Sequence, residues 1–164
     1  MNKLITCILL IFTINVNASE LIGEVIKVND GDTITLLDAN KDQYKVRLSG
    51  IDAPEKKQAF GKVSKQSLSD MLAGQVVTVG YNKRDRYARI VGKVIFKGLD
   101  ANLEQIKRGL AWHYKKYESE QDVDDRSKYA QEEYLAQQSK HGLWLENNPI
   151  APWDFRKKER IMLQ

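Results

Sequence analysis

Carboxylates and guanidiniums stand at the predicted turns of this chain or alternate with apolar residues along its predicted strands. They are Asp30, Asp32, Arg47, Asp52, Glu55 and Arg89. A divalent cation takes carboxylate oxygens as ligands, a water nucleophile needs a base, and fixed cations stabilise the charge that gathers on a phosphate under attack. The combination therefore indicates metal-assisted cleavage of a phosphodiester, provided that the fold brings these side chains together.

The first eighteen residues have the composition of an export signal. Lys3 is their one charged residue, an apolar run extends from Leu4 to Phe12, and small Ala18 ends the segment. This pattern predicts a signal peptide over residues 1–18 and a secreted or periplasmic protein. The uncharged run is shorter than the ~20 residues of a membrane span, so we expect no membrane association after cleavage. The single cysteine, Cys7, lies in this segment, which leaves the exported chain without a disulfide.

Residues 19–164 are predicted to form one domain and a monomer. The chain has 164 residues, with 26 Lys and Arg against 22 Asp and Glu. This mild positive excess is compatible with a nucleic-acid substrate but does not establish one. No repeat or low-complexity tract divides the chain, and a domain of this size buries most of its apolar surface in a single core.

Short β-branched runs predict five strands, at residues 22–28, 33–37, 44–49, 75–81 and 89–96. A helix over residues 60–73 is predicted between the third and fourth strands, because apolar residues recur there at helical spacing before Gly74. Two more helices are predicted after the strands, from Asp100 to Gly109 and from about Asp124 to Lys140. This order fits a β-barrel with helices (α+β), a five-stranded OB-fold Greek-key barrel with three α-helices.

Five motifs follow one another along most of the mature chain. They are the D-G-D-T turn at Asp30 to Thr33, Arg47 in the third strand, D-x-P-E at Asp52 to Glu55, the segment Tyr87-Ala88-Arg89, and the helix end from Glu104 to Ala111. Either acidic motif alone is typical of an ordinary turn. Together and in this order they resemble the thermonuclease family, the staphylococcal nuclease-like enzymes, in the form of a bacterial secreted member.

The resemblance implies an OB-fold nuclease with a calcium site. In the family, Ca²⁺ is held at the positions of Asp32, Asp52 and the backbone carbonyl of Ala53, and Asp30 is expected to support this site from outside. Alanine stands at position 53 where the staphylococcal enzyme has threonine, a change that a carbonyl ligand tolerates. Calcium accepts several oxygen ligands in loose geometry, so two carboxylates, a carbonyl, waters and a substrate phosphate suit it.

The resemblance also implies the catalytic roles. Glu55 is expected to orient or deprotonate the attacking water, while Arg47 and Arg89 grip the phosphate and stabilise its extra charge. Arginine suits this role because its planar fork meets two oxygens at once. The implied activity is endonucleolytic hydrolysis of DNA and RNA with low sequence specificity, leaving 3′-phosphates. Ala88 replaces a motif glycine, which matters if the backbone there needs a positive φ.

Three tyrosines are candidates for substrate contact, because every base offers a π-face on which an aromatic ring can stack. They are Tyr87, Tyr114 and Tyr117. For Tyr117 a partly buried surface position is the competing interpretation.

Two other features have simpler interpretations than a role in catalysis. His113 and Lys115 form the H-x-K of a phospholipase-D-type nuclease, but Glu120 stands where that motif needs an aspartate. His113 is therefore predicted to be an exposed residue at a strand end. The basic run from Arg156 to Arg160 is predicted to be a mobile, solvated end rather than a dedicated DNA contact.

An OB-fold module that binds single-stranded nucleic acid or a protein partner without cutting is the alternative function, because a fold does not determine a function. A pure binder has no reason to keep Asp32, Asp52 and Glu55, whose charges repel phosphate when no metal is present. The carboxylates therefore favour the enzyme.

Overall fold

The computed structural model describes residues 19–163, so the predicted signal peptide lies outside the described residues. The strands are β1 (Ser19–Asp30), β2 (Thr33–Leu37), β3 (Gln43–Leu48), β4 (Ile51–Asp52), β5 (Val76–Arg84), β6 (Ile90–Phe96), β7 (Leu99–Asp100) and β8 (Trp112–His113). The helices are α1 (Gly61–Leu72), α2 (Ala101–Lys107), α3 (Val123–Gln138) and α4 (Pro152–Met162), with short 3₁₀ segments η1 (Lys115–Glu120) and η2 (Gly142–Leu145).

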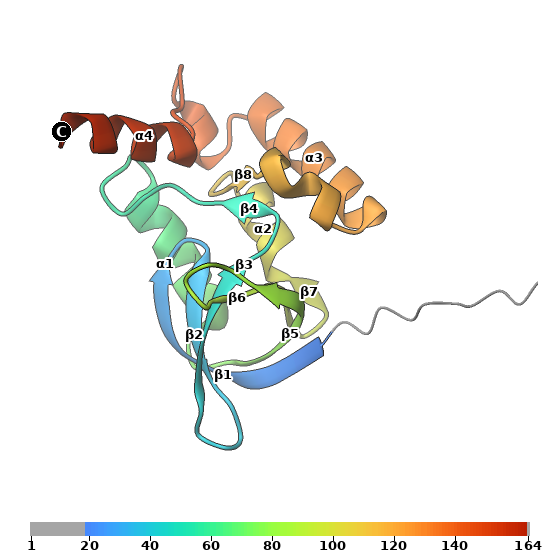
Figure 1. The fold of residues 1–164 in the computed structure, drawn as a ribbon. Coiled ribbons are helices and arrows are strands. Elements are labelled where there is room, and N and C mark those ends of the chain that lie inside the picture. The colour runs from blue at the N-terminus through green and yellow to red at the C-terminus, as the bar shows by residue number, and fades with distance from the viewer. Residues whose placement is uncertain (1–18, 164) are drawn as a thin grey trace, which may run out of the picture.

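Five strands form a closed barrel. They run in the order β3-β2-β1-β5-β6 through antiparallel pairs, and a parallel pairing of β3 with β6 closes the ring. The two-stranded sheet of β4 and β8 lies between the barrel and the C-terminal helices α3 and α4 (Figure 1). The predicted OB-type barrel with helices is therefore confirmed, and α4 is an additional helix beyond the three predicted.

Strand β1 is long because it pairs on both of its edges, with β2 along its second half and with β5 along its first. Its register against β2 shifts between Val25 and Lys27 and again between Val28 and Asp30. Such bulges bend a strand and increase its twist, which is how an open sheet curls into a barrel. The second irregularity ends the pairing at the turn that carries the first pair of carboxylates.

The barrel interior is filled by the apolar side of the alternating pattern that the sequence shows. Buried residues of the barrel strands are Val25, Val28, Ile34, Leu36, Val46, Leu48, Val77, Val79, Ile90 and Val94. Leu68 and Leu72 of α1 and Ile106 of α2 complete the same core. Both helices are thereby fixed against the barrel, and their ends become rigid supports for the adjoining loops.

His113 is buried, with 1% of its surface exposed, so the prediction of an exposed strand-end residue was wrong. It pairs with Ile51 in the small β4–β8 sheet, and its ring Nε2 lies 2.7 Å from the side-chain oxygen of Gln121. The backbone N–H of His113 donates to Glu133 of α3 at 2.9 Å. The residue is thus a structural link between β8 and the C-terminal helices.

The basic C-terminal run belongs to helix α4, so the prediction of a mobile end was also wrong. Pro152 occupies the first turn of this helix, where its missing N–H costs nothing. Trp153 stacks on Tyr114 with ring centroids 5.3 Å apart and contacts Trp112 edge-on at 5.6 Å. Within residues 19–163, no helix combines the length and apolar character that a membrane crossing requires.

Candidate active site

The turn between β1 and β2 is packed tightly against two other elements. A Cβ at Gly31 would lie 1.9 Å from Ser64 Oγ of α1 and 2.7 Å from the Ala53 Cβ, so no side chain fits there. The amide of buried Gln105 in α2 donates to the Gly31 carbonyl at 2.8 Å. Glycine at this position therefore lets the turn lie directly against the loop after β4, which brings Asp32 to that loop.

Arg47 joins two buried aspartates, Asp32 of this turn and Asp52 at the end of β4. Its Nη1 lies 3.2 Å from Asp32 Oδ2, and its Nη2 lies 2.9 Å from Asp52 Oδ1. The same Nη1 donates to the Leu48 carbonyl at 2.9 Å, which orients the fork. The backbone N–H of Ala53 donates to Asp32 Oδ2 at 2.6 Å. The structure therefore brings together Arg47, Asp32, Asp52 and the Ala53 backbone N–H.

A residue that the sequence did not single out completes the cluster. Arg156 of α4 reaches Asp52 Oδ2 through Nη2 at 2.7 Å and Asp52 Oδ1 through Nη1 at 3.2 Å. Its Nη1 also donates to Glu55 Oε1 at 2.7 Å. The only signal in the sequence was a basic run, which surface helices and mobile ends share, and nothing local indicates that it returns to a site 101 residues away.

Burial and charge shape the electrostatics of the cluster. Burial, helped by the neighbouring charge of Asp32, raises the pKa of Asp30 to about 6. Burial also raises the pKa of Asp52, while Arg156 and Arg47 act in the opposite direction. Partial burial disfavours the charge on Arg156, but hydrogen bonds to Asp52 and Glu55 outweigh this effect and raise its pKa. The arginines thus compensate carboxylate charge that would otherwise be costly to bury.

The donor set fits a hard divalent cation only in part. Asp32 in the β1–β2 turn and Asp52 at the end of β4 offer buried carboxylate oxygens, the ligand type that Ca²⁺ takes. Over residues 19–163, however, no three His, Cys, Asp or Glu side chains lie together as a metal-holding group. An ion here would need two carboxylates, a backbone oxygen such as that of Ala53, waters and a substrate oxygen, which the loose coordination of calcium permits. Asp30 contacts the Asp32 backbone N–H, at 3.2 Å, as a supporting residue would.

Arg89 lies in the connection between β5 and β6 and pairs with Asp85. Its Nε and Nη2 both lie 2.7 Å from Asp85 Oδ2. The Asp85 Oδ1 accepts the backbone N–H groups of Tyr87 and Arg89 at 2.9 and 3.0 Å. In the described part of the chain, no hydrogen bond or ion pair joins Arg89 to Asp32, Asp52 or Glu55. The structure thus orients Arg89 through its own loop and, among residues 19–163, does not join this predicted catalytic residue to the acidic cluster.

The three predicted substrate tyrosines occupy different surroundings. Tyr114 stacks on Trp153 and meets Tyr117 edge-on at 5.2 Å, while burial and the nearby charge of Asp52 raise its pKa. Tyr117 is 43% exposed. Tyr87 is 65% exposed and is flanked by the guanidinium groups of its loop, at 4.8 and 5.6 Å from the ring centre. Tyr114 is therefore the tyrosine that the structure places beside the buried carboxylates.

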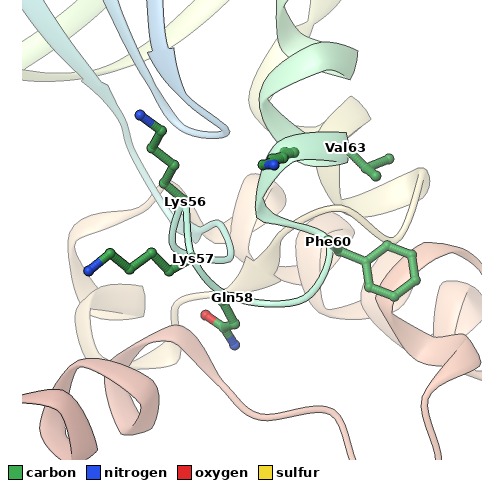
Figure 2. A pocket seen from close by; sticks show the side chains of 6 residues that line it. Lys56, Lys57, Gln58, Phe60 and Val63 are labelled. Carbon is green, nitrogen blue, oxygen red and sulfur yellow. The ribbon is translucent and has the colours of Figure 1, made fainter.

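A basic hollow opens at the loop that follows Glu55. It has a volume of about 550 Å³ and is lined by Lys56, Lys57, Gln58, Phe60, Lys62 and Val63. Figure 2 shows Lys56 and Lys57 extending from the loop to one side, with Phe60 and Val63 on the other. Its lysine ammonium groups add positive charge to the loop between Glu55 and α1.

The sequence is similar to those of known proteins. The sequence pattern of the family described as "Staphylococcal nuclease homologue" matches residues 45–146, more than half of the chain. The chain belongs to the staphylococcal nuclease family. This membership confirms the family predicted from the motifs, and it places the chain among the nucleases, a class of phosphodiester hydrolases.

The family members most informative for this chain are bacterial and plant proteins. The chain is 41% identical over 160 residues to a protein of Haemophilus influenzae named "Uncharacterized endonuclease", covering 96% of this chain and 86% of that protein. It is 39% identical over 160 residues to an Escherichia coli protein of the same name, covering 97% of this chain and 100% of the other. It is 39% identical over 118 residues to "Staphylococcal-like nuclease CAN1" of Arabidopsis thaliana, covering 72% of this chain and 35% of that protein.

Proposed function

We propose that this protein is a calcium-dependent endonuclease that hydrolyses DNA and RNA with low sequence specificity. One observation carries the proposal: Arg47 holds the buried carboxylates of Asp32 and Asp52 together, and Glu55 is tied to the same cluster. Two acidic metal ligands, a carboxylate base and fixed guanidiniums are the parts that phosphodiester hydrolysis requires. Membership of the staphylococcal nuclease family supports the same function.

The chemistry follows from the roles that these side chains can perform. Bound Ca²⁺, held by Asp32, Asp52 and the Ala53 carbonyl, would supply a Lewis acid for the phosphate and for water. Glu55 accepts a proton from the water that attacks phosphorus in line. The bond from phosphorus to the 5′-oxygen breaks, the leaving oxygen gains a proton, and a 3′-phosphate remains. Arg47 offsets the charge that develops on the phosphate oxygens.

Arg89 would complete the grip on the phosphate from the β5–β6 connection. Its guanidinium is oriented by Asp85, and its side chain is 24% exposed. A guanidinium held in this way loses little freedom when it binds two phosphate oxygens. Tyr114, next to Asp52, would then contact the adjoining nucleotide.

Cleavage in the presence of calcium tests the proposal. We expect the purified protein to cut single-stranded DNA and RNA with Ca²⁺, to stop when a chelator is added, and to lose about 10²–10³ in rate in Glu55→Gln. Binding of single-stranded DNA without calcium-dependent cleavage would overturn the proposal and favour the non-catalytic OB-fold module.

Export is part of the proposed function. The composition of residues 1–18 supports a signal peptide, and the mature protein would then act in the periplasm or outside the cell. Expression with and without residues 1–18, followed by fractionation, tests this. Equal cytoplasmic retention of both forms would contradict export.

A further inference from the structure

Helix α4 approaches the Glu55 loop through several independent contacts. Trp153 stacks on Tyr114. Gln58, three residues after Glu55, accepts the Glu55 backbone N–H at 3.1 Å and donates its amide to the carbonyl of Ile150, just before α4. These contacts place the first turns of α4 against the loop, so that Arg156 faces Asp52 and Glu55 with little freedom to move away.

The Glu55 side chain depends on this helix. It is 37% exposed and follows Pro54 on a loop, which leaves a carboxylate several rotamers unless a partner selects one. Within residues 19–163, the guanidinium of Arg156 is the side-chain partner of the Glu55 carboxylate, with the Nη1–Oε1 distance at 2.7 Å. The same guanidinium is bidentate on Asp52, which is 1% exposed and fixed in β4. Arg156 therefore fixes the Glu55 carboxylate relative to Asp52, a buried residue of a strand.

We propose that Arg156 is a positioning residue of the active site. It holds the Glu55 carboxylate at a fixed position relative to Asp52, so that α4 contributes a residue on which catalysis depends. The inference rests on the proposed nuclease function, because Glu55 matters only if it handles the attacking water. Arg156 acts through Glu55 and does so with a geometry that a single ammonium group cannot reproduce, since one fork reaches two carboxylates.

Kinetics of Arg156→Gln test the proposal with Ca²⁺ and single-stranded DNA. We expect kcat to fall by about 10–100-fold, the usual effect of removing a group that orients a ligand or catalyst, while KM changes by less than about threefold. Arg156→Lys should lose part of the rate, because it keeps the charge but not the fork. Lys157→Gln, an exposed residue of the same helix, removes an equal charge and should keep full activity.

A double variant separates positioning from general structural support. If Arg156 acts through Glu55, Glu55→Gln combined with Arg156→Gln should be no slower than Glu55→Gln alone, within about threefold. Losses that multiply would overturn the proposal. A kcat of Arg156→Gln equal to that of Lys157→Gln would overturn it as well. If Arg156→Gln does not fold, Arg156→Lys decides alone: reduced kcat in a folded protein supports the proposal, and wild-type kcat refutes it.

Calcium affinity, measured by titration calorimetry with Ca²⁺ alone, provides a readout besides activity. Arg156→Gln should bind Ca²⁺ at least as tightly as the wild type, because the variant loses a positive charge beside Asp52. Weakening by tenfold or more would show that Arg156 only maintains the metal site, which refutes positioning of Glu55. A wild-type protein that does not cleave would overturn the nuclease function, whereas normal wild-type cleavage with an unaffected Arg156→Gln overturns this inference alone.

Discussion

Arg47 holds two carboxylates together that would otherwise repel each other. Its side chain is 14% exposed and touches both Asp32 and Asp52. In Arg47→Gln we expect kcat on single-stranded DNA to fall by about 10²–10³-fold, because a fixed cation that offsets phosphate charge is lost. The midpoint of thermal unfolding without Ca²⁺ should fall too, and Ca²⁺ should restore part of it by supplying positive charge to the two carboxylates.

Lys45 provides the matched control for this prediction. It lies two residues earlier on the same strand, its side chain is exposed, and Lys45→Gln removes the same unit of charge. We expect single-turnover cleavage and thermal unfolding of Lys45→Gln to match the wild type. Equal rates for Arg47→Gln and Lys45→Gln would show that the contacts of Arg47 with Asp32 and Asp52 do not contribute to catalysis.

Ala88 has a backbone conformation that a side chain disfavours. Its φ is 59°, in the left-handed region, and alanine stands at this position instead of the motif glycine. A Cβ in this region costs about 1–2 kcal/mol, part of which glycine gives back through its larger unfolded-state entropy. We expect Ala88→Gly to raise the free energy of unfolding in urea by up to about 1 kcal/mol.

Ala73 is the control for the glycine substitution. It follows α1 with φ at −60°, so it has no such strain to relieve. Ala73→Gly should therefore lower the free energy of unfolding, because it only adds freedom to the unfolded chain. If Ala88→Gly lowers the free energy of unfolding as much as Ala73→Gly does, the left-handed φ of Ala88 does not destabilise the folded protein.

The β5–β6 connection is the element that aims Arg89. Hydrogen bonds from Arg89 and the backbone hold the pKa of Asp85 below its usual range, against the effect of burial. A depressed pKa means that the ion pair stabilises the fold above the unfolded pKa of about 3.9 and is lost only as the pH falls through the folded value. In Asp85→Asn the amide oxygen still accepts the turn N–H groups, but the ion pair to Arg89 is gone.

We therefore expect Asp85→Asn to lower kcat/KM on single-stranded DNA by about tenfold at neutral pH, because Arg89 is no longer held in one orientation. Asp38→Asn is the control. Asp38 accepts two backbone N–H groups at 2.9 Å in the β2–β3 connection, as Asp85 does in its own loop, and among residues 19–163 no arginine pairs with it. A loss of kcat/KM of the same size in both variants would mean that turn stability, not the aim of Arg89, is what changed.

Elements with a local signal were predictable, whereas contacts across the chain were not. Short β-branched runs located all five barrel strands, and Gly74 marked the end of α1 to within two residues. The two-residue strands β4 and β8 have no such period, because a bridge this short is made by tertiary pairing. His113 was mistaken for an exposed residue for this reason, since its burial depends on α3 and on Gln121.

The candidate site divides in the same way. Asp32, Asp52 and Glu55 were identified because short motifs carry them, and Arg47 because it lies on a predicted strand. Their convergence depends on Gly31, whose missing side chain lets the first turn reach the second loop. Arg156 had no motif. Its contact with Glu55, 101 residues away, depends on where α4 docks, and contacts such as the stacking of Trp153 on Tyr114 hold the helix there.

At the scale of the whole molecule, a small positive excess coexists with a local group of basic side chains near the acidic cluster. The net charge is only +4, with 26 basic against 22 acidic residues. Lys56, Lys57 and Lys62 nevertheless line one hollow at the loop that follows Glu55, and Arg156 contacts Glu55 itself. Figure 2 shows Lys56 and Lys57 at this hollow. Local gathering of charge is what attracts a polyanion, since fields of exposed groups decay within about 10 Å in salt.

The lysines that line the hollow after Glu55 are expected to affect how nucleic-acid binding depends on salt concentration. Each phosphate that a lysine neutralises on single-stranded DNA adds about −0.7 to the slope of log K against log salt concentration. Replacing the three hollow lysines, Lys56, Lys57 and Lys62, by Gln should therefore flatten that slope by about 2 when all three meet phosphates.

Binding is measured by fluorescence anisotropy in the inactive Glu55→Gln background with Ca²⁺ present. As a control, exposed Lys27, Lys45 and Lys128 are replaced together, which removes the same charge elsewhere. The net charge falls equally in both triple variants. An equal change of slope would therefore show that the bound single-stranded DNA does not contact the hollow.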